Sequence, residues 1–174
     1  MNRPAAVTVL GVLNILFGVW RIFSALGAFA LLGVHEKTAE IYRLPLYSSW
    51  VYSVTLFGVI AGAALLTAGI GFFGLKSWAR VTAILYSVGS IIFALASVVV
   101  MAVMAAPIIQ ANAQHNDYIM AFGELVSAIS NSVFSIIYAA ILLAFMFVPL
   151  VVDAFRNAAM ISRSDDVPPP LPIV

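Results

Sequence analysis

Hydrophobic residues form four long runs along this chain, and most polar and charged residues lie between the runs. The runs cover residues 4–33, 50–74, 78–106 and 125–152. Each exceeds the roughly 20 apolar residues that a helix needs to cross the hydrocarbon core of a bilayer. At this length only a helix satisfies its own backbone hydrogen bonds in lipid. The pattern therefore predicts an all-α membrane protein with four transmembrane helices in an antiparallel bundle.

The segments between the runs predict how the helices are connected. Residues 74–77 form a tight turn, so the second and third helices should be antiparallel neighbours. The connection between the third and fourth runs contains Pro107 and mixes polar with apolar residues. It either extends the third helix or forms a short amphipathic helix on the membrane surface. We expect one transmembrane domain over residues 1–157 and an extended, Pro-rich cytoplasmic tail over 158–174.

Basic residues predict the orientation in the membrane. Lys37 and Arg43 lie in the first connection, whereas five basic residues lie on the opposite side. These five are Arg3, Lys76, Arg80, Arg156 and Arg163. Because the side richer in Lys and Arg stays in the cytoplasm, both termini are expected there. Arg21 lies about 25 Å along the first helix at 1.5 Å per residue, so we expect it to snorkel to the outer interface.

Composition narrows the class of protein further. The chain is 64% hydrophobic and 9% charged, whereas soluble domains are roughly half apolar and a quarter charged. The net charge of +1 gives no reason to expect a nucleic acid as partner. Membrane lipids are expected partners, together with other membrane protein subunits or a second copy of the chain. The absence of cysteine excludes disulfides and thiolate chemistry.

Small residues mark the faces on which helices should pack. Gly58 and Gly62 form a small-xxx-small pattern, and Gly69 follows on the same run. Such residues let two helix backbones approach closely in lipid. Packing within the bundle is favoured over self-association. On the third run the serines recur at helical spacing and form one face; they are Ser87, Ser90 and Ser97.

Polar residues also recur every three or four positions on the fourth run, where they share one helix face. Hydrogen bonding between helices explains such a face, and this reading is favoured. The alternative is a polar groove between the third and fourth helices that other runs help to line. The candidate groove residues are Asn14, Thr67, Ser127, Asn131, Ser135 and Tyr138.

Signatures of chemistry are not found in the sequence. His35 and His115 are single residues in predicted loops, and no phosphate loop, HExxH motif or nucleophile elbow occurs. We therefore expect no catalytic residue, cofactor or metal site, and no enzymatic activity. The leading functional prediction is a scaffold or accessory subunit of a larger membrane assembly. The alternative is a small transporter or ligand-binding membrane protein that uses the polar groove.

Two segments resemble a family of uncharacterised bacterial four-helix integral membrane proteins. The first is the opening RPAAVTVLGVLNILFG over residues 3–18, and the second is the turn GLKSWAR over residues 74–80. The resemblance implies a location in the bacterial inner membrane. It transfers no activity and no functional residue.

Overall fold

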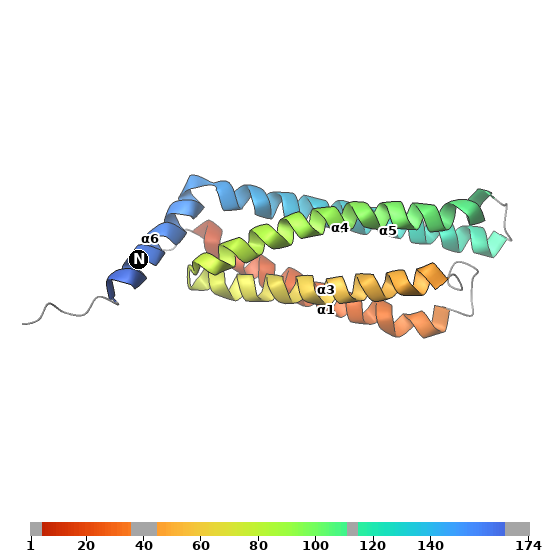
Figure 1. The fold of residues 1–174 in the computed structure, drawn as a ribbon, viewed down its shortest axis with the longest axis horizontal. Coiled ribbons are helices and arrows are strands. Elements are labelled where there is room, and N and C mark those ends of the chain that lie inside the picture. Colours follow the sequence, from red (N-terminus) through yellow and green to blue (C-terminus); the bar gives the residue numbers. More distant parts are fainter. Residues whose placement is uncertain (1–4, 36–44, 111–114, 166–174) are drawn as a thin grey trace, which may run out of the picture.

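The computed structural model describes residues 5–35, 45–110 and 115–165, and every regular element in these ranges is a helix (Figure 1). The helices are α1 (Ala5–His35), α3 (Pro45–Phe73), α4 (Ser77–Gln110), α5 (His115–Phe147) and α6 (Pro149–Asp165). The first four are long and apolar enough to cross a membrane. The prediction of an all-helical protein with four membrane spans is therefore confirmed, and the chain is a multi-pass membrane protein.

The helices on both sides of the third connection are longer than the predicted spans. α4 continues through Pro107 to Gln110, which is the first of the two predicted alternatives, whereas α5 begins at His115 rather than near residue 125. Most of the expected connection is thus helical. A proline removes only one backbone hydrogen bond, and membrane helices tolerate it where neighbouring groups make up the loss. Composition alone overestimated the length of this loop.

The end of the fourth span also differs from the prediction, because Pro149 interrupts it. α5 ends at Phe147, and the amides of Val151 and Val152 bond to the carbonyl of Val148 to start α6. A proline is well suited to a first helical turn, where its missing N–H is not needed. α6 leaves the bundle obliquely and extends to Asp165 (Figure 1), so the first part of the expected tail is helical.

Some sequence predictions fall outside the described residues. Arg3 lies within 1–4, Lys37 and Arg43 of the first connection lie within 36–44, and the Pro-rich segment lies within 166–174. Residues 45–49, predicted to belong to the first connection, form the start of α3. Arg163 lies in α6.

The four long helices form two close antiparallel pairs, α1 with α3 and α4 with α5, and the pairs meet along α3 and α4. The turn from α3 to α4 is as tight as the sequence predicts, since the amide of Lys76 bonds to the Gly71 carbonyl at 3.0 Å. Leu75 closes this turn in the left-handed region with φ 51°. α1 begins and α5 ends at the same end of the bundle, here called the terminal end; the other is the loop end (Figure 1).

Glycines hold α1 against α3. A Cβ placed on Gly62 would lie 2.8 Å from the carbonyl oxygen of Gly18, and one on Gly69 would lie 2.8 Å from that of Gly11. Gly58 lies against the Cβ of Ala25 in the same way. Real Cβ atoms essentially never come this close. The small-residue face of α3 therefore packs within the bundle, against α1.

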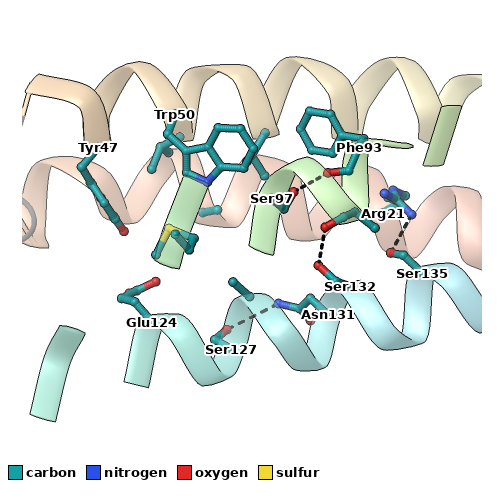
Figure 2. Close-up of a pocket in the computed structure, with 16 residues that line it drawn as sticks. Arg21, Tyr47, Trp50, Phe93, Ser97, Glu124, Ser127, Asn131, Ser132 and Ser135 are labelled. Carbon is teal, nitrogen blue, oxygen red and sulfur yellow. Dashed lines mark hydrogen bonds between the residues drawn. The ribbon is translucent and has the colours of Figure 1, made fainter. Parts of the chain in front are cut away.

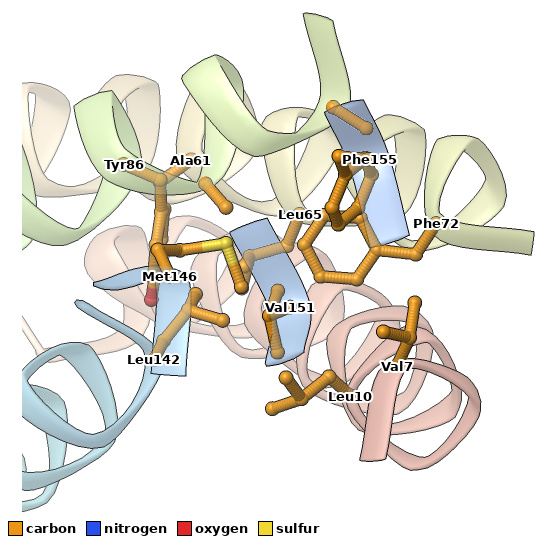
Figure 3. Close-up of a cluster of buried hydrophobic side chains, with 12 residues drawn as sticks. Val7, Leu10, Ala61, Leu65, Phe72, Tyr86, Leu142, Met146, Val151 and Phe155 are labelled. Carbon is orange, nitrogen blue, oxygen red and sulfur yellow. The ribbon is translucent and has the colours of Figure 1, made fainter. Parts of the chain in front are cut away.

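Two clusters of buried side chains close the bundle at its ends. The terminal-end core joins α1, α3, α4, α5 and α6, with Leu65, Phe72, Leu142 and Met146 fully buried (Figure 3). Phe155 of α6 meets Phe72 edge to face at 5.5 Å. The loop-end core joins α3, α4 and α5 around Met101, Met104 and Ala121. Tyr86 belongs to the terminal-end core and also lines a cavity between the helix pairs.

Candidate functional site

A cleft lies between the α1–α3 pair and the α4–α5 pair. It has two adjoining compartments with volumes of about 280 and 310 Å³, at the lower limit of the roughly 300–1,000 Å³ of small-molecule sites. One compartment extends toward the loop end and includes Tyr47, Trp50 and Met101. The other extends toward the terminal end and includes Gly58, Tyr86 and Tyr138. Both share the following lining residues: Arg21, Ala28, Val54, Phe93, Asn131 and Ser135.

Arg21 supplies the positive charge of the cleft. Its Nη1 donates to the hydroxyl of Tyr86 at 3.0 Å and to Ser135 Oγ at 3.3 Å. The guanidinium also lies 5.7 Å from the ring centre of Phe57 and 5.8 Å from that of Tyr86, within range of cation–π attraction. In the part of the chain that the structure describes, each of these contacts is with an uncharged group, and none is an ion pair.

The depth of these contacts corrects the expectation for Arg21. Tyr86 lies about 14 Å along α4 from Ser77, and Ser135 lies about 18 Å from the end of α5 at Phe147. Both positions lie within the candidate spans rather than at their ends. The Arg21 side chain is therefore held inside the bundle by Tyr86 and Ser135, and it does not extend along α1 toward the outer interface as expected. Helical side chains point toward the N-terminus of their helix, so Arg21 points away from that interface and into the bundle.

Polar residues of α5 form one wall of the cleft, at the spacing read from the sequence. Ser127, Asn131 and Ser135 all line it (Figure 2), and the Asn131 amide nitrogen lies 3.4 Å from Ser127 Oγ. The opposite wall, however, comes from α1 and α3, while α4 supplies Phe93 and Ser97. The cleft therefore lies between the two helix pairs, and α1 and α3 contribute more of its lining than the groove predicted between the third and fourth helices implies. Spacing on one helix defines a polar face but not the helix opposite it.

Asn14 and Thr67, which were grouped with the groove, have different surroundings. Asn14 is completely buried, and its Oδ1 accepts a hydrogen bond from the Tyr138 hydroxyl. Its Nδ2 has no partner among the described residues. Thr67 is exposed on the outside of α3 and donates to carbonyls of its own helix. Asn14 thus extends the polar network from the cleft into α1, whereas Thr67 takes no part in it.

The serines of α4 divide between packing and the cleft. Ser87 is buried and donates to the Ala83 carbonyl at 2.8 Å. Ser90 is also buried, and its hydroxyl has no partner among the described residues. Ser97 lines the cleft and donates to the Phe93 carbonyl. The bond that joins α4 to α5 here comes from Ser132, which donates to the Ala94 carbonyl. Ser132 is not among the residues that the sequence pattern predicts for the groove.

Aromatic rings form the apolar surface of the cleft. Phe93 stacks on Phe57 with ring centres 3.9 Å apart and on Trp50 at 5.6 Å. Glu124 lines the cleft near Tyr47, at the opposite end from Arg21 (Figure 2). Within the described residues no group of three His, Cys, Asp or Glu side chains gathers as a metal site. The arrangement suits a ligand that has an apolar part and a polar or anionic part.

The Tyr138–Asn14 bond allows a test of this network. Tyr138→Phe should lower the free energy of unfolding by about 1–2 kcal/mol, because it leaves the buried amide of Asn14 without its partner. Tyr52→Phe is the matched control, since Tyr52 is exposed and packs on Phe29. Thermal unfolding in detergent micelles measures both variants. Equal stabilities for the two variants would mean that the bond contributes nothing to the bundle.

Fold and cleft together define a helical membrane protein with a cationic cleft at the middle of its bundle. Comparison with family models, with curated proteins and with solved structures finds no match to this chain.

Proposed function

We propose that this chain is a ligand-binding or small transport membrane protein whose ligand occupies the cleft around Arg21. The observation that carries the proposal is a guanidinium inside the bundle, on a helix able to span the membrane, beside open space and with only uncharged contacts among the described residues. A charged side chain within a membrane span is expensive and marks function by default. Polar residues that only held helices together would be packed against one another and leave no cavity.

The closed terminal end limits how such a protein works. The terminal-end core fills the bundle between the cleft and the terminal end, where α1 begins and α5 ends. The cleft therefore has no continuation across the whole bundle in this conformation. That arrangement supports a binding protein, or one state of a transporter in which helix pairs rock about a central site. In either case the chain has no catalytic role.

Single cysteines test whether the cleft contains water, because the natural chain has none. Asn131→Cys and Ser135→Cys should react with a charged, membrane-impermeant thiol reagent at least about tenfold faster than Ile137→Cys, since the reactive thiolate forms only where water is present. Ile137 is the matched control because it is exposed on the same helix and lines neither compartment. Labelling is followed by mass spectrometry on protein in lipid nanodiscs. Equal, slow labelling at all three positions would mean a dry cleft and would overturn the proposed function.

An accessory subunit of a larger assembly is the second candidate, and α6 favours it. This helix projects from the bundle (Figure 1), and its exposed surface combines Leu150 and Met160 with Asp153 and Arg156. A helix that leaves the bundle with exposed apolar residues offers a surface on which another subunit can pack. Purification from native membranes in mild detergent tests this role. A stable partner lost on deletion of residues 149–174 supports it, and recovery of the full chain alone contradicts it.

For either function, we propose that the protein lies in a bacterial inner membrane with both termini in the cytoplasm. Lys76, Arg80 and Arg156 support this orientation, because they lie at or beyond the terminal end of the spans. Basic residues next to spans are retained on the cytoplasmic side.

A further inference from the structure

We propose that the ligand of the cleft is an acyl-chain amphiphile with one anionic head group, a carboxylate or a phosphate, which enters sideways from the lipid between α1 and α5. The inference rests on the proposed ligand-binding function and names its substrate class. The anionic group binds Arg21, and the apolar part lies along the aromatic wall of the cleft.

The hydrogen bonds of Arg21 leave a place for the anion. A guanidinium has five N–H donors in a planar fork that matches carboxylate and phosphate oxygens. Both bonds of Arg21 to described residues use Nη1. Nε and Nη2 make none with those residues, and neither is among the buried side-chain atoms that lack a partner. Because Arg21 lines both compartments, an oxyanion in the cleft can bind these two nitrogens with two parallel bonds.

The apolar surroundings identify the ligand as an amphiphile rather than a free anion. Trp20 and Phe134 line the terminal-side compartment and are 71% and 74% exposed. In a membrane this exposed surface is covered by lipid, so the compartment opens sideways into the acyl-chain region. Trp50 and Phe93 continue the apolar surface toward the loop end. A ligand that fills the cleft therefore needs a chain as well as a charge.

Polar and acidic groups of α5 support entry from the side. Ser127 and Asn131 are exposed although they lie within a membrane-spanning helix. They border the cleft and offer hydrogen bonds to a head group that moves along it. Among the described residues, Glu124 is the one acidic residue that lines the cleft, and it lies at the loop end. The lateral opening between α1 and α5 has no described acidic residue in its lining.

Quenching of Trp50 by a brominated fatty acid tests the proposal. Trp50 becomes the single reporter when Trp20 and Trp78 are replaced by phenylalanine, and the protein is placed in nanodiscs of zwitterionic lipid. Dibromostearate should quench Trp50 at a concentration about tenfold lower than its methyl ester, which has the same chain without the charge. Arg21→Gln should abolish this difference. Arg21→Lys should preserve most of it, and Arg156→Gln, at an exposed position in α6, should preserve all of it.

Each other outcome has a distinct meaning. Equal quenching by the acid and its ester would show that the ligand needs no anionic head group, but it would leave the proposed ligand-binding function intact. No quenching of Trp50, together with fast labelling of Ser135→Cys, would overturn entry from lipid and leave a water-soluble ligand. Displacement of dibromostearate by equimolar acetate or inorganic phosphate would show that the ligand does not need an acyl chain. Slow labelling of both cleft cysteines would overturn the proposed function itself. Circular dichroism of Arg21→Gln and Arg21→Lys verifies that both variants are folded.

Discussion

Replacement of Gly62 by leucine should separate α1 from α3 and lower the free energy of unfolding by about 3 kcal/mol or more. Even a methyl group at this position would lie 2.6 Å from a side-chain carbon of Ile22 and 2.8 Å from the Gly18 carbonyl. The Ile22 side chain can move, but the Gly18 carbonyl belongs to the backbone of α1. The two helices must therefore move apart, and van der Waals contact between backbones is what drives helix association in lipid.

Gly27→Leu is the matched control for this experiment. Gly27 lies on α1 and is exposed, and an added Cβ there has no atom within 4 Å. The same substitution should be neutral or slightly stabilising, since glycine in a helix costs about 1 kcal/mol relative to good helix formers. Thermal unfolding and size-exclusion chromatography in detergent measure both variants. If Gly62→Leu were as stable as Gly27→Leu but changed the oligomeric state, the glycine face would serve self-association instead.

The number of helices could be predicted from the sequence because the signal for a membrane span is local. About 20 consecutive apolar residues suffice to identify a span without knowledge of any other helix. The ends of the helices were less predictable. Pro107 lies inside α4 whereas Pro149 separates α5 from α6, although both follow apolar runs. Whether a proline bends or ends a helix depends on the groups that surround its freed carbonyl, and those groups come from other helices.

The cleft could be predicted only in part, for the same reason. Spacing along α5 correctly placed Ser127, Asn131 and Ser135 on one face. The partners of Arg21, in contrast, are 65 and 114 positions away in the chain. The rise per residue gave the position of its Cα along α1. How the two helix pairs pack, however, decides where its side chain points and which helices face it. A charged residue inside an apolar run was therefore the strongest signal of a site in this sequence.

Arg21→Met should stabilise the protein while it removes the preference of the cleft for an anionic ligand. An arginine at the centre of a membrane helix costs roughly 3 kcal/mol, and the two bonds to neutral hydroxyls return about 0.5–1 kcal/mol each. Methionine is similar in length, and its sulfur packs well against the rings of Phe57 and Tyr86. The free energy of unfolding should therefore rise by about 1–2 kcal/mol.

Arg80→Met provides the matched comparison and should have the opposite sign. The Nε of Arg80 donates to the Met146 carbonyl at 3.1 Å, close to the end of α5, where backbone carbonyls lack helical partners. Loss of this bond and of a positive charge near a helix C-terminus should lower the free energy of unfolding by about 1 kcal/mol. Thermal unfolding in nanodiscs of zwitterionic lipid, without added fatty acid, measures both variants.

A binding residue is expected to reduce stability in the absence of its ligand, whereas a structural residue is expected to increase it. A clear loss of stability in Arg21→Met would mean that Arg21, like Arg80, holds helices together. The charge of Arg21 would then no longer support an anionic ligand in the cleft.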